Sequence, residues 1–477
     1  PSSLMDDFLV ATLFNYDSRK FEDYFKYKAP RGLKEIGISN IVNEYKYVDV
    51  PPIAQGNPAA KIAECVIRSN EYNHLKNNKR RRQGWLHRDG QYPFDKEVVG
   101  NYHVGAAKMM IKRFLKNNHS LIDEVADKLV SHLTNTNSDV LTKGRQTWCP
   151  FTMRSVTSSE AYKTVDDLIR KNLNKNTHNC LQFLSAITEL ITLDKLEYET
   201  IDIKFRTRLK YDRTTKSHLR CSRRSVTKVK KTVTGSSGVR KLMMSMITSF
   251  CGYLKTKERG RLRRRAIASP NIMLRMFLYV IENFHLELGK LIRSSTISIG
   301  GEEKKVKIVQ EMSKIESYHN GRTAQATEDK TKWNETMPTD GFALMHYMFF
   351  SNEVRAELGI PKVGVQITNL SQVMRVAEYL CSKKKIHLGG GHQTVGPKIK
   401  SKLKWTKEYK QYMNVNTRKW FSKIEEDIDD DGYVNVPNGM LMGMQNACST
   451  TWACIVGDFR CQKGSSLSTV ISSDDSR

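Results

Sequence analysis

The chain has 477 residues, of which 39% are hydrophobic and 27% are charged. That apolar content can build a large core, so the composition excludes a wholly disordered chain. Lys and Arg number 78 against 50 Asp and Glu, which gives a net charge of +28. Such an excess is typical of proteins that bind nucleic acid, and an acidic membrane surface is the second candidate partner.

Nine cysteines are present, and no two of them form a C-x-x-C pair. Cys448, Cys454 and Cys461 fall close together but lack the spacing of a zinc site. We therefore expect reduced thiols, most of them buried, in a cytosolic or nuclear compartment. The sequence shows no secretory signal, and no segment has the roughly 18 to 20 apolar residues that a membrane-spanning helix needs.

The first fifty residues mix aromatic and charged side chains and end at Pro51 and Pro52, so we treat them as an extension without an assigned structure. Helical periodicity begins beyond Gly105. The segment Ser120-Leu-Ile-Asp123 resembles a capping box, which predicts that a separate helix starts there. Residues 166–173 and 181–191 predict further helices, which we interpret as scaffold.

A basic stretch from Lys204 to Lys231 holds twelve Lys or Arg and a single acid, Asp212. Its first part alternates at period two, which predicts a strand, and residues 226–233 predict a second one. We therefore expect a two-stranded ribbon at about 203–233 that binds phosphates and doubles as a nuclear import signal. A solvated charged hairpin is the alternative. The basic residues on one face of the first strand are Lys204, Arg206, Arg208 and Lys210.

After the ribbon, Gly235 to Gly238 predict a flexible joint. The apolar pattern that follows predicts a helix from Leu242 to Tyr253, and a stronger helical pattern begins after Pro270. Seven apolar residues mark the core face of this second helix: Met273, Leu274, Phe277, Val280, Ile281, Phe284 and Leu288.

Four arginines alternate between Lys257 and Arg265, so an extended backbone would place their guanidinium groups on one face. A guanidinium group binds phosphate oxygens through two hydrogen bonds, which suits a triphosphate or a nucleic-acid backbone. General anion binding is the alternative. The four residues are Arg259, Arg261, Arg263 and Arg265.

The segment from Thr327 to Glu335 places Asp329 near the end of a predicted short strand, five positions before Asn334. This pattern suits a metal-dependent nucleotidyl transferase. Asp329 would hold the metal, and Asn334 would form a hydrogen bond with a ribose hydroxyl. Taken alone, such an aspartate is far more often a loop or cap residue.

A glycine-rich segment follows from Pro437 to Thr450. Gly439 and Gly443 would allow the backbone to approach a template or a base pair closely. The residues after them predict a helix that presents Asn446. The structural alternative is a Met-rich core helix after a glycine turn.

The segment Ile471-Ser-Ser-Asp-Asp475 predicts a hairpin turn with two adjacent carboxylates. Asp474 and Asp475 cannot both stay charged in one site without a cation, and oxygen-bound Mg²⁺ is the usual remedy. Two such ions, about 3.5 to 4 Å apart, clamp the attacking and leaving oxygens of a phosphoryl transfer. A lone Asp-Asp pair is usually an exposed turn.

These four motifs appear in the order that is typical of template-directed palm polymerases. At these residues the chain resembles the catalytic subunit of orthomyxovirus, influenza-like RNA polymerases. The resemblance covers about Pro51 to Asp475, and the first fifty residues do not match the start of the family. It depends on four segments: 258–268, 327–335, 439–450 and 472–475.

The resemblance implies an α+β right-hand polymerase with mostly helical fingers, a basic β-ribbon, an incomplete antiparallel palm sheet and no thumb. Residues 1–50 would be the N-terminal extension and residues 51–325 the fingers and fingertips. Residues 326–477 would be the palm, with an inserted fingers segment at about 370–435. The implied reaction is RNA-templated nucleotidyl transfer for viral genome replication and transcription.

The resemblance also implies the site and the partners. Asp329, Asp474 and Asp475 would hold two Mg²⁺ ions, for which Mn²⁺ can substitute, and the four arginines would receive the triphosphate and the template. Asn334 and Asn446 would check the ribose, while Gly439 and Gly443 would let the loop move. The implied partners are NTPs, the viral RNA template and promoter, an acidic endonuclease subunit and a cap-binding subunit. These would assemble in the host nucleus and the virion ribonucleoprotein, without a membrane.

Glu328 and Lys330 depart from the family pattern, which has Gly and Asn beside the implied metal ligand. On a strand these neighbours point away from Asp329, so we expect the metal site to survive. We expect this chain alone to be inactive, because the remaining palm motifs do not follow. The alternative from another class is a non-catalytic RNA-binding relic of such a polymerase, and a reverse transcriptase is a weaker third option.

Overall fold

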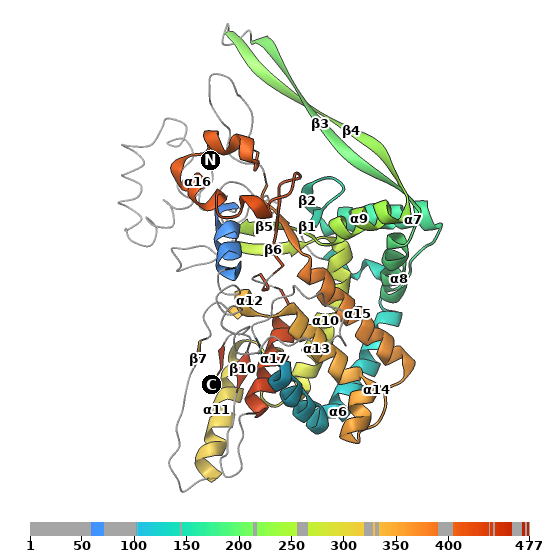
Figure 1. Cartoon of the computed structure of the whole chain (residues 1–477), viewed down its shortest axis with the longest axis vertical. Coiled ribbons are helices and arrows are strands. Elements are labelled where there is room, and N and C mark those ends of the chain that lie inside the picture. The colour runs from blue at the N-terminus through green and yellow to red at the C-terminus, as the bar shows by residue number, and fades with distance from the viewer. Residues whose placement is uncertain are drawn as a thin grey trace.

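The computed structural model describes residues 59–70, 102, 104–143, 146–212, 217–254, 266–318, 328–329, 333–389, 404–437, 439–441, 444–459, 470–472 and 475–476. Helices and small sheets are mixed in these ranges, which confirms the predicted α+β class. A helical body fills one end of the molecule, and a long two-stranded ribbon projects from the other (Figure 1). Among the described helices, none has the length and hydropathy needed to span a bilayer.

The helical body is built around α10, whose seven predicted core residues are all buried. Asn271 starts this helix, because its side-chain oxygen accepts a hydrogen bond from the backbone N–H of Leu274 at 3.1 Å. Phe284 of α10 meets Phe350 of α13 edge to face, with ring centroids 5.6 Å apart. Five helices pack in this body: α6 (Val104–Asn135), α10 (Ile272–Leu291), α13 (Thr339–Phe350), α15 (Val365–Ser382) and α17 (Asn446–Phe459).

Shorter elements surround this body. Between α6 and the ribbon lie η1 (Ser138–Lys143), the antiparallel pair β1 (Gln146–Cys149) and β2 (Arg154–Thr157), α7 (Ser158–Leu173) and α8 (Cys180–Ile191). After the ribbon come α9 (Ser236–Ile247) and, following α10, α11 (Gly301–Tyr318). Later elements are α12 (Trp333–Thr336), α14 (Asn352–Leu358), η2 (Lys407–Tyr412), α16 (Val415–Phe421) and η3 (Glu425–Asp427).

A four-stranded sheet has the order β6-β5-β8-β9. Strand β5 pairs antiparallel with β6 and parallel with β8, and β8 pairs antiparallel with β9. Phe250 in β5 and Ile386 in β8 are buried, so this sheet shares the core of the helical body. Its strands are β5 (Ser249–Leu254), β6 (Ala266–Pro270), β8 (Lys385–His387) and β9 (Tyr433–Asn435).

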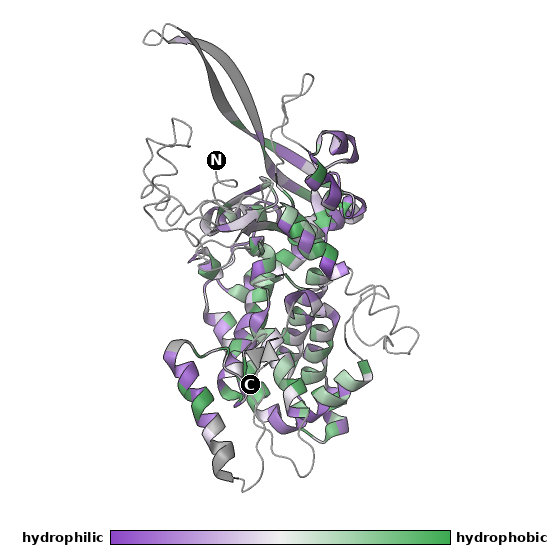
Figure 2. Ribbon diagram, turned by 90° about the vertical axis from the view of Figure 1, so that its left-hand side faces the viewer, coloured by the Kyte–Doolittle hydropathy of each residue, from purple (hydrophilic) through white to green (hydrophobic). Residues whose placement is uncertain are grey.

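The predicted basic ribbon is confirmed as β3 (Lys195–Asp212) paired antiparallel with β4 (Ser217–Thr234). Both views show it standing away from the rest of the chain (Figures 1 and 2). Its first strand begins at Lys195, earlier than predicted. Leu196 and Tyr198, near this start, are buried and anchor the base of the ribbon to the core. Residues 225–232 of its second strand are all exposed.

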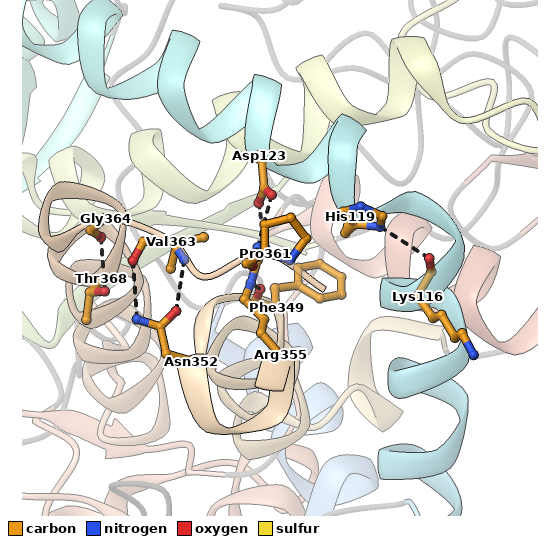
Figure 3. A network of polar contacts seen from close by, with 10 residues as sticks. All are labelled: Lys116, His119, Asp123, Phe349, Asn352, Arg355, Pro361, Val363, Gly364 and Thr368. Atoms are coloured by element: carbon orange, nitrogen blue, oxygen red, sulfur yellow. Dashed lines mark hydrogen bonds and ion pairs between the residues drawn. The ribbon is translucent and has the colours of Figure 1, made fainter. Parts of the chain in front are cut away.

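Arg355 in α14 is fully buried and ties several segments together, as Figure 3 shows. Its terminal nitrogens donate to the carboxylate of Asp123 in α6, with Nη1 at 3.0 Å from Oδ2. Its remaining bonds reach Phe349 O at 2.8 Å and Pro361 O at 2.9 Å. A buried guanidinium is tolerated here because an opposite charge and backbone acceptors replace its water.

Two predicted boundaries are wrong. Helix α6 runs through Ser120 without interruption, so no separate helix begins at the capping-box pattern. The helix predicted from Leu242 to Tyr253 ends at Ile247, because the residues from Ser249 onward pair with β6 and β8 instead. The helices predicted at 166–173 and 181–191 are confirmed, although the first one begins at Ser158.

Candidate active site

The acidic motifs meet in a small sheet of order β10-β11-β7. Strand β10 (Ile471–Ser472) and strand β11 (Asp475–Ser476) form the predicted hairpin, and β11 pairs antiparallel with β7 (Glu328–Asp329). In this register Asp475 lies directly opposite Asp329, and Ser476 lies opposite Glu328. Directly opposed residues lie on the same face of an antiparallel pair, so the register places Asp329 and Asp475 together. Asp474 and Lys330 lie outside the described residues.

The hairpin is anchored to the segment that follows α10. Ile471 is buried, and its backbone N–H donates to Ser294 O at 2.7 Å. Its carbonyl oxygen accepts from the backbone N–H of Thr296 at 2.9 Å and from the Thr296 hydroxyl at 3.1 Å. These bonds fix the position of β10, and through it the position of β11 beside β7.

Helix α12 carries Asn334 and follows β7 closely in the sequence. It also contacts a segment from the N-terminal part of the chain. The carboxylate of Glu335 accepts a hydrogen bond from Arg68 at 2.8 Å, and Arg68 belongs to a helix formed by residues 59–70. Asn334 is half-buried, and its side-chain oxygen has no partner among the residues that the structure describes. A ligand hydroxyl would satisfy that oxygen, which is the role predicted for Asn334.

The glycine loop is joined to α12 by its backbone. Met440 N donates to Asn334 O at 2.7 Å. Gly439 is buried and has φ +65°, and a Cβ there would lie 2.7 Å from Ser69 Oγ and would collide with Glu335 O. Both the dihedral angle and the close approach therefore require glycine at this position. Gly443 lies outside the described residues.

The ammonium group of a buried lysine contacts the same loop. Lys384 is 1% exposed, and its ammonium group donates to Gly439 O and, at 3.2 Å, to Cys381 O. Burial lowers the pKa of Lys384 to about 8. The Glu378 carboxyl is also fully buried, and desolvation raises its pKa well above the usual range although Gln445 and Lys384 lie close by. The loop thus lies over a cluster of buried polar side chains.

Asn446 is exposed at the first position of α17, as predicted. The carboxyl of Glu282 in α10 caps this helix by accepting from Ala447 N at 3.4 Å. Burial raises the pKa of Glu282 to about 7, against the opposing effect of the backbone N–H groups of Ala447 and Asn446. Glu282 therefore fixes the end of the helix that presents Asn446.

The predicted phosphate-binding residues are only partly described. Residues 255–265, which hold Arg259, Arg261, Arg263 and Arg265, lie outside the described residues. The strands on either side of them pair from Leu254 to Ala266, so the segment is held at both ends by one antiparallel hairpin. In the ribbon, Lys204 pairs with Ser225, Arg206 with Arg223, Arg208 with Cys221 and Lys210 with Leu219.

The sequence did not identify the polar residues that contact the glycine loop and the start of α17 from the interior. Lys384 stands in a run of three lysines and carries no local signal of burial. Glu282 and Glu378 do carry one, because each is an acid set among the apolar residues of a core helix. An acid at such a position is rarely buried without a specific role.

A comparison with known families decides the identity of the chain. The family model described as Influenza RNA-dependent RNA polymerase subunit PB1 matches residues 33–476. The chain belongs to this family. The match starts before Pro51, so the family resemblance reaches into the segment that we had treated as an extension. It includes the arginine motif, both acidic motifs and the glycine loop, and it confirms the predicted relationship to influenza-like RNA polymerases.

Proposed function

We propose that this RNA polymerase subunit carries the catalytic centre for RNA-templated nucleotide addition. The observation that carries the proposal is the pairing of Asp475 with Asp329, which joins two motifs that are far apart in the sequence. Together with Asp474, which directly precedes Asp475 in the sequence, three carboxylates would gather at one small sheet. The surrounding chain would be the fingers and palm of a right-hand polymerase.

The donor chemistry of this centre fits Mg²⁺, which prefers carboxylate oxygens. Asp329, Asp474 and Asp475 would hold the ions, and Mn²⁺ could replace them. When bound, the metal pair neutralises charge on the attacking 3′-oxygen and on the leaving pyrophosphate. Without a cation, adjacent carboxylates at one site would repel each other.

The chain's own residues would position the reactants. Asn334 would hold a ribose hydroxyl through its unpartnered side-chain oxygen, and Asn446 would contact the ribose from the end of α17. Gly439 would let the loop backbone approach the template, and Gly443 would let that loop move. The arginines at 259, 261, 263 and 265 would receive the triphosphate, and the basic ribbon would contact RNA phosphates.

As a subunit, the chain would assemble with an acidic endonuclease subunit and a cap-binding subunit on the viral RNA promoter. The host nucleus and the virion ribonucleoprotein would be its locations. The family match and the pairing of the two acidic motifs in one sheet do not favour the alternative, a non-catalytic relic of such a polymerase.

The test is Asp475→Asn in the assembled polymerase. Nucleotide addition on a short primed RNA template should be abolished, while RNA binding stays unchanged, because the amide keeps the shape but loses the charge. Asp127→Asn, at an exposed position of α6, is the matched control and should keep wild-type activity. Wild-type activity of Asp475→Asn would refute the assignment, and a wild-type complex that binds RNA without adding nucleotides would support the relic.

A further inference from the structure

A second group of ligand-type side chains lies inside the helical body, on residues that the polymerase chemistry does not use. His285 of α10, His346 of α13 and Cys448 of α17 place one ligand atom each within 4.8 Å of the others. All three residues are completely buried. No sequence motif indicates this group, because its members come from three separate helices and have no motif spacing.

The geometry of the group is that of a compact donor triad. His285 Nε2 lies 2.8 Å from His346 Nε2, and Cys448 Sγ lies 4.0 Å from the same His346 nitrogen. Tetrahedral zinc, with bonds of about 2.0–2.1 Å to nitrogen and 2.3 Å to sulfur, needs separations of about 3.3 and 3.6 Å between these atoms. Closing the triad around zinc would widen the nitrogen separation by about 0.5 Å and bring Cys448 Sγ about 0.4 Å closer to His346 Nε2. It would also draw Cys448 Sγ and the His285 nitrogen, which lie within 4.8 Å of each other, to about 3.6 Å.

One imidazole is already oriented as a ligand. The Thr451 hydroxyl lies 2.9 Å from His285 Nδ1 and 3.3 Å from Ala447 O, so it can donate to the carbonyl and accept from the ring. With that hydrogen-bond direction the proton of His285 is on Nδ1, and the lone pair of Nε2 is free to bind a metal shared with His346 and Cys448. A hydrogen bond from the far ring nitrogen is how proteins usually orient a metal-binding histidine.

The donor set selects the metal. Two imidazoles and a thiol are borderline-soft ligands that suit Zn²⁺ and do not suit Mg²⁺, which takes oxygen ligands. We propose that His285, His346 and Cys448 supply three ligands of a zinc site, separate from the acidic sheet, that clamps α10, α13 and α17 together. Since α17 begins at Asn446, zinc would also hold the helix that presents this residue.

The test is the metal content of the full chain. The chain is produced in zinc-supplemented medium, passed through metal-free reducing buffer and analysed by elemental mass spectrometry. Wild type should retain zinc in equimolar amount, and Cys448→Ala should lose it. Cys454→Ala is the matched control, because Cys454 is equally buried on the same helix but lies outside the group. It should retain zinc as wild type does.

Two further measurements do not depend on the folding of the cysteine variant. Cobalt exchanged into the wild-type chain should show a thiolate-to-metal charge-transfer band. Thr451→Val, which nearly preserves shape, should weaken zinc binding by about 10- to 100-fold. Wild type that holds no zinc, or equal zinc in Cys448→Ala and Cys454→Ala, would overturn the proposal and leave a hydrogen-bonded histidine pair.

Discussion

A side chain at position 439 would collide with the backbone oxygen of Glu335, so the glycine loop and α12 can meet only through glycine. We predict that Gly439→Ala lowers the free energy of unfolding by about 1 to 3 kcal/mol, because it adds a Cβ at a left-handed dihedral angle. It should also slow nucleotide addition, since the bond from Met440 N to Asn334 O would be disturbed. Denaturant unfolding and primer extension would measure the two effects.

Gly364→Ala is the matched control for this prediction. Gly364 has φ −73°, and a Cβ there would meet nothing within 4 Å. Gly364 is the N-cap of α15, where alanine is less favourable than glycine, so the substitution should cost less than about 1 kcal/mol and should leave activity unchanged. Equal behaviour of the two alanine variants would show that the loop can move away from α12.

The buried pair of Arg355 and Asp123 makes a second prediction, on stability alone. Asp123→Asn should destabilise the chain by about 3 kcal/mol, because it leaves a buried guanidinium without its counter-charge. Thermal or denaturant unfolding would measure this change. Glu124→Gln breaks the exposed pair with Lys128 in the same helix and should cost less than about 0.5 kcal/mol. A similar small effect at Asp123 would mean that the carboxylate does not compensate the Arg355 charge.

Glu282 predicts a pH dependence. Its pKa is raised from 4.5 to about 7 in the folded chain, so the folded state keeps a proton between these pH values that the unfolded state releases. The resulting stability is fully present below pH 4.5 and is lost as the pH rises through 7. Relative to Glu282→Gln, wild type should lose on the order of 3 kcal/mol across this window.

The measurement is the difference in free energy of unfolding between wild type and Glu282→Gln at a series of pH values. Glu287→Gln, at an exposed position of the same helix, is the control and should show no comparable trend. A flat difference for Glu282→Gln would indicate that the carboxyl is charged in the folded chain.

The ribbon predicts a salt dependence. Replacing Arg206, Arg208 and Lys210 by Ala should weaken RNA binding, and the slope of log affinity against log salt should become shallower by about 0.7 to 0.9 for each lost contact. Filter binding at several salt concentrations would measure it. Replacement of three exposed lysines elsewhere, Lys128, Lys305 and Lys419, is the charge-matched control. Equal slopes for the two variants would mean that the ribbon is only a solvated surface or an import signal.

Local sequence patterns correctly predicted the elements whose periodicity is visible within a single segment. The period-two alternation around Arg206 became β3, and the apolar stripe that includes Phe277 became the core face of α10. The same patterns failed where a distant segment decided the outcome. The residues from Ser249 onward have a helical pattern but form a strand, because β6 and β8 supply strand partners. Such tertiary pairing outweighs local propensity.

The site divides in the same way. The motif order predicts that Asp329 and Asp475 belong to one site; in the structure the two residues are register partners in β7 and β11. Lys384 and the pair of His285 and His346 have no sequence pattern, because their burial depends on which helices become neighbours. Glu378 is marked in the sequence only as an acid within an apolar helix. Only packing in three dimensions shows that these polar groups are buried together.

The pairing of Asp329 with Asp475 also bears on the order of events during synthesis. Contacts between distant segments close large loops, and the entropy of closure opposes them until both partners exist. The residues from Trp333 to Phe459 leave the ribosome first and can pack while Asp475 is still being made. Translation that stops just before Asp474 would therefore release a packed subunit in which Asp329 lacks both partner aspartates. Such a subunit could occupy an assembly without contributing nucleotide addition.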